Sequence, residues 1–124
     1  MTQKRKILIV DDEPDVTLLV SCLLEFHNYT VTCLNDSTLV PETLKKTDFD
    51  LICTDIMMPN INGFSLIQQI RKDEKHKDAK LIALSAKEFT EDEYQFFLDQ
   101  KVLLIKKPYE PQELVAKING LLTQ

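Results

Sequence analysis

Five short apolar runs, each followed by a segment with helical spacing, constrain the fold of this chain more than any other feature of its sequence. Most of the runs are continuously apolar, as strands buried on both faces of a parallel sheet are, and the second is rich in β-branched residues. Strands that alternate with helices predict an α/β fold, a doubly wound parallel sheet with helices on both faces. The predicted strands span residues 6–10, 30–34, 50–54, 81–84 and 102–105.

Helix start and stop signals lie between the first three predicted strands. Pro14 suits the first turn of a helix, and Asn28 can adopt the left-handed conformation that ends one. Asp36 offers a cap for a second helix ending near residue 46, which Pro41 either starts late or kinks. For the first helix, the spacing predicts a core-facing stripe of Val16, Leu19, Val20 and Leu23, with Leu18 and Cys22 exposed on the opposite face.

The later helices carry similar signals. Apolar residues at helical spacing mark a third helix over residues 64–70, and the charged run 71–80 is interpreted as a solvated helix end and loop. Thr90 and Glu93 have the spacing of a capping box at the start of a fourth helix. Pro111 begins the last helix.

Polar side chains follow four of the five predicted strands at the point where each strand ends. They are Asp11 and Asp12, Asp55, Ser85 and Lys107. Because parallel strands place their carboxyl ends at one edge of the sheet, these side chains should converge there. Three carboxylates repel one another unless a cation joins them, and hard oxygen ligands suit Mg²⁺. A lysine and a hydroxyl opposite them would complement phosphoryl oxygens, so the set predicts carboxylate-phosphate chemistry with Asp55 as the nucleophile.

Each of these residues also has a purely structural interpretation. Asp12 and Glu13 could cap the first helix, Ser85 could cap a turn, and Lys107 could be an ordinary surface lysine. Because the residues follow different strands and all fall at the same predicted edge, a shared site is the better interpretation.

Composition excludes several classes of function. The chain has 124 residues, enough for one domain, and its net charge of −5 argues against non-specific nucleic-acid binding. Its apolar runs are too short to span a membrane, and its polar start is no signal peptide. Cys22, Cys33 and Cys53 are dispersed in apolar segments without CxxC spacing, which predicts buried, reduced thiols in a cytoplasmic protein. With only His27 and His76 available, a zinc site is not expected.

Four motifs together resemble the receiver domain of two-component response regulators (CheY-like). They are Val10-Asp11-Asp12, Asp55 to Pro59 with Gly63, Ser85-Ala86, and Lys107-Pro108. The resemblance covers essentially all 124 residues, so we expect a single receiver domain over residues 1–124 with no output domain in this chain. It implies a flavodoxin-like three-layer sandwich with strand order 2-1-3-4-5.

The resemblance also implies a role for each matching residue. Asp55 would accept a phosphoryl group from the histidine of a sensor kinase or a histidine phosphotransfer protein. Ser85 would be the switch hydroxyl, and Lys107 would pair first with Asp55 and then with the phosphate. The expected Mg²⁺ ligands are Asp12, Asp55, the backbone carbonyl of Met57, and Asp11 through water. The residues expected to shape turns are Pro59, Gly63 and Pro108.

The chain departs from the family pattern in three places. The usual aromatic switch residue, three positions before the lysine, is Leu104, and residues 99–101 are polar where the family has a small Gly-Ala pair. Lys87 occupies the position two after the switch hydroxyl. We therefore expect a switch that acts through the loop 87–90 and the face formed by the fourth helix, fifth strand and fifth helix. That face would bind a downstream protein or a second copy, and Leu18 and Cys22 would form a docking strip for the kinase or phosphotransfer helix.

Other functions compete with a phosphorylated receiver. A non-phosphorylated interaction module of the same fold is disfavoured, because such domains usually lose part of the acid cluster or the lysine. An Mg²⁺-dependent phosphohydrolase would need a substrate pocket or cap segment, for which 124 residues leave no room. A dinucleotide-binding enzyme is excluded because the only glycines are Gly63 and Gly120. We therefore expect a signalling receiver rather than an enzyme, without membrane or nucleic-acid binding of its own.

Overall fold

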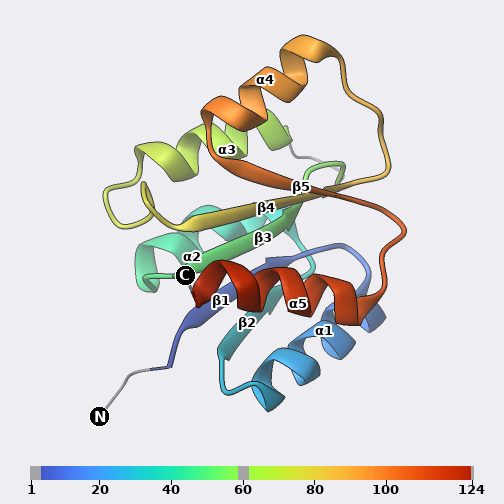
Figure 1. Ribbon diagram of the computed structural model, residues 1–124. Helices are drawn as coiled ribbons and strands as arrows, with labels where there is room; N and C mark the ends of the chain where they lie inside the picture. The colour runs from blue at the N-terminus through green and yellow to red at the C-terminus, as the bar shows by residue number, and fades with distance from the viewer. Residues whose placement is uncertain (1–3, 59–61, 124) are drawn as a thin grey trace.

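The computed structural model describes residues 4–58 and 62–123, in which a parallel sheet lies between two layers of helices (Figure 1). The five strands pair in the order β2-β1-β3-β4-β5, which confirms the predicted topology. All four strand pairs are parallel, so the carboxyl ends of the strands share one edge. The strands are β1 (Lys6–Val10), β2 (Thr30–Leu34), β3 (Leu51–Asp55), β4 (Lys80–Ser85) and β5 (Val102–Lys106).

Helices cover both faces of the sheet (Figure 1). One face packs against α1 (Pro14–Phe26) and α5 (Pro111–Leu122), and the other against α2 (Val40–Lys46), α3 (Gly63–Lys72) and α4 (Glu91–Asp99). Successive residues of β1 point to opposite faces, so Ile7 and Ile9 enter one core cluster while Leu8 and Val10 enter the other. Both faces of the three inner strands β1, β3 and β4 are therefore buried, which explains why these strands are so apolar.

Local signals in the sequence determine several helix ends. Thr90 and Glu93 form the predicted capping box, with hydrogen bonds in both directions. Asn28 follows α1 with φ of 72°, the left-handed conformation expected of it. Asp36 caps a short 3-10 helix (Ser37–Leu39) rather than an α-helix, and α2 starts only after it, with Pro41 in its first turn. Pro41 thus starts this helix late instead of kinking it.

Three expectations from the sequence were wrong. Leu19, placed in the core stripe of α1, is 49% exposed, because Thr17, Val20 and Leu24 face the sheet instead. Of the three thiols expected to be buried, Cys22 is exposed, Cys33 is half-buried and only Cys53 is buried.

The charged run 71–80 is also not simply solvated. His76 within it is completely buried, accepting a hydrogen bond from the Phe49 N–H at 3.0 Å and lying 2.6 Å from Asp73 through Nδ1. Among the described residues, no helix is long and apolar enough to cross a membrane.

Candidate functional site

The predicted site residues meet at the carboxyl edge of the sheet. Asp11 follows β1 directly, Asp55 and Ser85 are the last residues of β3 and β4, and Lys107 follows β5. The strand register continues past the ends of the strands, since the Lys107 N–H donates to the Ser85 carbonyl at 2.9 Å. The sheet therefore brings together side chains that are far apart in the sequence, as expected.

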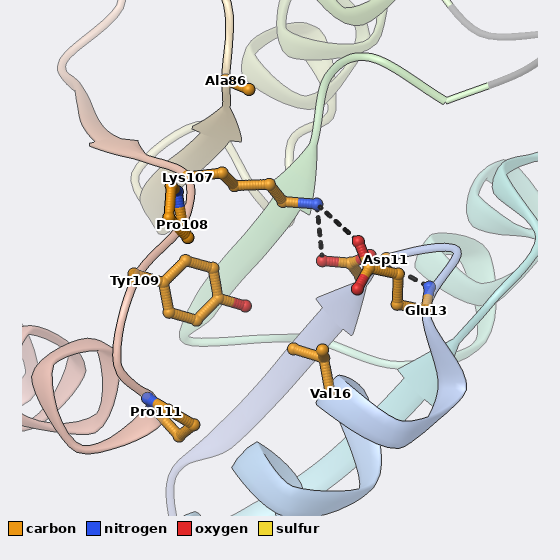
Figure 2. Close-up of a pocket in the computed structure, with 8 residues that line it drawn as sticks. All are labelled: Asp11, Glu13, Val16, Ala86, Lys107, Pro108, Tyr109 and Pro111. Carbon is orange, nitrogen blue, oxygen red and sulfur yellow. Dashed lines mark hydrogen bonds and ion pairs between the residues drawn. The ribbon is translucent and has the colours of Figure 1, made fainter.

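The ammonium of Lys107 is the centre of the site. Its Nζ donates to Asp55 Oδ2 at 2.8 Å and lies 3.2 Å from Asp11 Oδ2 and 3.8 Å from Glu13 Oε1. Figure 2 shows the lysine reaching from the β5–α5 loop across to the two acids of the β1–α1 loop. Asp55 is 4% exposed and Asp11 only 1%, so both carboxylates are taken out of water. One cation thus faces several acids in a largely buried pocket.

Burial and charge shift the proton affinities of these groups. Burial raises the pKa of Asp11, and this effect outweighs the hydrogen bond from the Glu13 N–H and the nearby Lys107 charge, which lower it. Burial alone would lower the pKa of Lys107, but its hydrogen bond to Asp55 and the negative charges of Asp11 and Asp55 raise it above its ordinary value. Lys107 therefore remains protonated at neutral pH and neutralises part of the acid cluster.

The acid cluster fits a divalent cation. Asp11, Asp12 and Asp55 each offer a carboxylate oxygen, and these oxygens lie within 4.8 Å of one another. Asp11 Oδ2 is buried and accepts no hydrogen bond of good geometry from the described residues; its polar neighbour is the Lys107 ammonium. Lys107 is one positive charge against three carboxylates, so negative charge remains at the cluster. Closely spaced hard oxygen donors with uncompensated charge are what Mg²⁺ requires.

The turn after β3 is shaped by close packing. A Cβ added at Gly63 would lie 2.3 Å from Ile56 Cβ and 2.8 Å from the Ile56 carbonyl oxygen, so no side chain fits there. Asp55 Oδ1 accepts the Met57 N–H at 2.8 Å, which fixes the carboxylate against this turn. Asn62, which is not predicted as a cap from the sequence, caps α3 by accepting hydrogen bonds from the N–H groups of Phe64 and Ser65. Pro59, also expected to shape the turn, lies outside the described residues.

The other predicted side chains are placed as follows. Ser85 is buried, and its Oγ accepts the Lys87 N–H at 3.0 Å. Pro108 follows Lys107 through a cis peptide bond. Met57 has an exposed side chain, and its backbone carbonyl remains a predicted ligand.

A cavity of about 400 Å³ adjoins the acid cluster (Figure 2). Two residues that line this cavity, Glu13 and Tyr109, are not predicted as site residues from the sequence. The sequence predicts Glu13 only as a possible helix cap, yet its side chain pairs with Lys107 and makes no capping hydrogen bond at the start of α1. Tyr109 gave no signal in the sequence; its ring lines the cavity, and burial raises the pKa of its hydroxyl. The cavity is lined by Asp11, Glu13, Val16, Ala86, Lys107, Pro108, Tyr109 and Pro111.

The expected docking strip on α1 is exposed and larger than the sequence indicated. Leu18 is 64% exposed and Cys22 is also exposed. Leu19, 49% exposed, and Phe26, 86% exposed, add to the apolar surface of the same helix. Phe26 lies two turns of helix after Leu18 and Leu19, so exposed apolar residues run along the length of α1.

Known proteins share both this sequence pattern and this fold. A family model described as the response regulator receiver domain matches residues 7–119. Response regulator SaeR of Staphylococcus aureus is 34% identical over 118 residues, which cover 95% of this chain and 50% of SaeR. The DNA-binding dual master transcriptional regulator RpaA of Synechocystis sp. is 32% identical over 117 residues, which cover 94% of this chain and 48% of RpaA. The chain thus spans about half the length of these relatives.

Solved structures agree on the fold. Chemotaxis response regulator CheY4 of Vibrio cholerae superposes with a TM-score of 0.84 at 24% identity, over 96% of this chain and 99% of CheY4. A CheY-like receiver domain protein of Methanospirillum hungatei gives a TM-score of 0.85 at 25% identity, over 98% of this chain and 95% of that one. The family match along almost the whole chain and the shared topology lead to one conclusion: the chain belongs to the response regulator receiver domain family of two-component signalling.

Proposed function

We propose that this domain accepts a phosphoryl group on Asp55 from the phosphohistidine of a sensor kinase or phosphotransfer protein. The observation that carries the proposal is the buried contact of 2.8 Å between Asp55 Oδ2 and Lys107 Nζ beside two further aspartates. An Asp55 carboxylate oxygen forms the new bond to phosphorus, the bond from phosphorus to the histidine nitrogen breaks, and the imidazole keeps that electron pair. Lys107 is then positioned to pair with a phosphoryl oxygen.

The acid cluster would hold Mg²⁺ through Asp12, Asp55 and the Met57 carbonyl, with Asp11 acting through water. The ion would supply positive charge to offset the charge of the phosphoryl oxygens. The Asp11 carboxylate is fixed by a hydrogen bond from the Glu13 N–H at 3.1 Å, and the Lys107 ammonium lies next to it.

Chemical labelling tests this function directly. With Mg²⁺ and acetyl phosphate, the protein should gain one acid-labile phosphoryl group, measured by intact-protein mass spectrometry. Loss of the label in both acid and alkali identifies an acyl phosphate, because a phosphoserine survives acid and a phosphohistidine survives alkali. Absence of any label under these conditions would instead favour the non-phosphorylated interaction module.

Replacing Asp12 by alanine should weaken Mg²⁺ binding by at least tenfold, because one direct carboxylate ligand is removed. The free protein should lose no stability, since the change relieves repulsion among three carboxylates within 4.8 Å. Mg²⁺ titration followed by tyrosine fluorescence, together with thermal unfolding, measures both effects. A titration that matches the wild-type curve would contradict the role given to Asp12.

The exposed strip on α1 is proposed as the docking surface for the partner helix. Leu18→Glu places a charge on this strip, so transfer from a partner phosphohistidine should slow by roughly tenfold through lost apolar contact. Phosphorylation by acetyl phosphate should be unchanged, because Leu18 is 64% exposed and is not among the site residues. Loss of both reactions together would point to misfolding, whereas unchanged transfer from the phosphohistidine would place docking elsewhere.

The domain is proposed to act in the cytoplasm as a single receiver unit over residues 1–124. Its output would pass through the face of α4, β5 and α5 to a downstream protein or a second copy. This face exposes Leu98, 69% accessible, and Leu103, 36% accessible. RpaA is described as DNA-binding, whereas this domain is proposed to contact protein and not nucleic acid.

Ser85→Ala should separate phosphorylation from this output. The serine hydroxyl is the proposed contact to the phosphoryl group, and a charge-assisted hydrogen bond of this kind contributes roughly 1.5–3 kcal/mol. Labelling of Asp55 should persist while phosphorylation-dependent partner binding or dimerisation falls by tenfold or more. Leu104→Ala should have a milder effect. Amide chemical shifts that respond to phosphorylation only around residue 55, and never over residues 87–106, would contradict this switch.

A further inference from the structure

Lys87 is bonded to two elements at once. Its backbone N–H donates to Ser85 Oγ at 3.0 Å, at the end of β4. Its ammonium lies 3.6 Å from Glu93 Oε2 and 5.5 Å from the centroid of the Phe89 ring. The backbone of Lys87 is therefore hydrogen-bonded to the serine at the candidate site, and its side chain is paired with a residue in the first turn of α4.

Glu93 has a second partner that makes this connection more than a surface ion pair. Its Oε1 accepts the Thr90 N–H at 2.9 Å, and its own N–H donates to Thr90 Oγ1 at 3.2 Å. The Thr90 N–H and the Lys87 charge both lower the pKa of Glu93, so the carboxylate is ionised at neutral pH. A single carboxylate thus holds the Lys87 ammonium with one oxygen and closes the amino end of α4 with the other.

The opposite end of α4 is fixed independently. The Arg71 side chain donates to the carbonyl oxygens of Gln100 at 2.8 Å and Lys101 at 3.3 Å, just after the helix ends, and to Ala79 at 2.7 Å. Phe97, in the second half of α4, is fully buried. Near the amino end, by contrast, a cavity of about 230 Å³ adjoins the loop, lined in part by Ser85, Phe89 and Leu104. The first turn of α4 is therefore the end of this helix that can follow a movement of the loop.

We propose that the Lys87–Glu93 ion pair transmits the state of Ser85 to the first turn of α4, which makes Glu93 a positioning residue of the switch. This inference rests on the proposed function, since it requires a phosphoryl group at Asp55. When the Ser85 hydroxyl turns toward a phosphoryl oxygen, the Lys87 N–H loses its acceptor and the Lys87 backbone shifts. The ammonium carries that shift to Glu93 and so to the hydrogen bonds that close α4.

The ion pair is partly exposed, with 46% of the Lys87 side chain and 28% of the Glu93 side chain accessible. Such pairs couple two sites weakly, so breaking this one should reduce the transmitted response by roughly two- to fivefold rather than abolish it. The reduction should be smaller in high salt, which screens the pair.

Glu93→Gln is the informative variant. Glutamine can still accept the Thr90 N–H, so the capping box is kept, but it has no charge to hold the Lys87 ammonium. Glu91→Gln is the matched control, because it removes one negative charge from the same turn and Glu91 has no ion pair among the described residues. Lys87→Met removes the ammonium while leaving Glu93 and its cap untouched.

Amide hydrogen exchange with and without Mg²⁺ and beryllofluoride, a phosphoryl mimic, provides the readout. In wild type and Glu91→Gln, binding should change exchange over residues 91–95. In Glu93→Gln and Lys87→Met this change should be roughly two- to fivefold smaller. The variant that carries both substitutions should show no further loss. In all of these variants, residues 55–57 and 85–87 should still respond.

Two outcomes distinguish failure of the proposed ion-pair coupling from failure of the proposed function. If the exchange response over residues 91–95 in Lys87→Met equals that of wild type, the proposed coupling is wrong. This holds even if Glu93→Gln frays the helix, because Lys87→Met leaves the capping box intact. Absence of any response at residues 55–57 in the wild-type protein overturns the proposed function itself.

Discussion

Asp55→Asn is expected to abolish phosphorylation by acetyl phosphate and by any partner phosphohistidine. An amide is not a competent nucleophile toward phosphorus at neutral pH, so the loss should be complete within detection, at least a thousandfold in rate. Quantitative mass spectrometry of the phosphoryl adduct over time measures it. Equal labelling of the variant and the wild type would place the acceptor elsewhere.

The same variant needs a control for folding, because Asp55 is also the partner of Lys107 at 2.8 Å. Asparagine can still accept that hydrogen bond, and the substitution removes one of three crowded carboxylates. The variant should therefore be folded and at least as stable as the wild type by thermal unfolding. A stable protein that cannot be labelled isolates the chemical role of the carboxylate.

Gly63→Ala should destabilise the fold by about 1–3 kcal/mol, the usual range for overpacking a close-packed site. The added Cβ would lie 2.3 Å from Ile56 Cβ, 2.8 Å from its carbonyl oxygen and 2.9 Å from its Cα. Because two of these are backbone atoms, rotating the Ile56 side chain does not relieve the clash. The midpoint of urea unfolding should fall measurably, and labelling of Asp55 should slow, since the turn that follows it must move.

Gly120→Ala is the matched control in the same protein. Gly120 lies in α5 and is exposed, and an added Cβ there meets no atom of the described residues within 4 Å. Alanine in a helix interior is favoured over glycine by roughly 0.5–1 kcal/mol, so this variant should be more stable than the wild type. If Gly63→Ala lowers the free energy of unfolding and Gly120→Ala raises it, the effect at Gly63 arises from its packing against Ile56. Destabilisation by both would argue against that explanation.

The sheet and the central site could be predicted because their sequence signals are unambiguous. Strands buried on both faces must be apolar throughout, and the parallel arrangement then determines where Asp11, Asp55, Ser85 and Lys107 meet. The capping box of Thr90 and Glu93 is similarly local, since both partners lie within one turn. These predictions needed no knowledge of side-chain packing.

Two of the failures arose where a polar residue occupies a core position. Thr17 faces the sheet in place of Leu19 because its hydroxyl finds partners there, donating to the Pro14 carbonyl at 3.0 Å and accepting from Asn35 at 3.1 Å. Apolar periodicity alone cannot detect a buried threonine. His76 was missed for the same reason, because its burial depends on Asp73 and on the Phe49 backbone, which come from different parts of the chain.

The position of Lys107 has a consequence for how the edge strand β5 is held in the sheet. During synthesis, the first 55 residues bring all three aspartates of the cluster, whereas their ammonium partner follows β5, the last strand and an edge of the sheet. A nascent chain therefore contains all three carboxylates long before it contains the cation that offsets part of their charge. Docking of β5 onto β4 brings that cation to Asp11 and Asp55, so the pairing of these two strands and the partial neutralisation of the cluster are coupled. Electrostatic attraction between Lys107 and the acids thus favours the pairing of β5 with β4, and the pocket is complete only when β5 is in place.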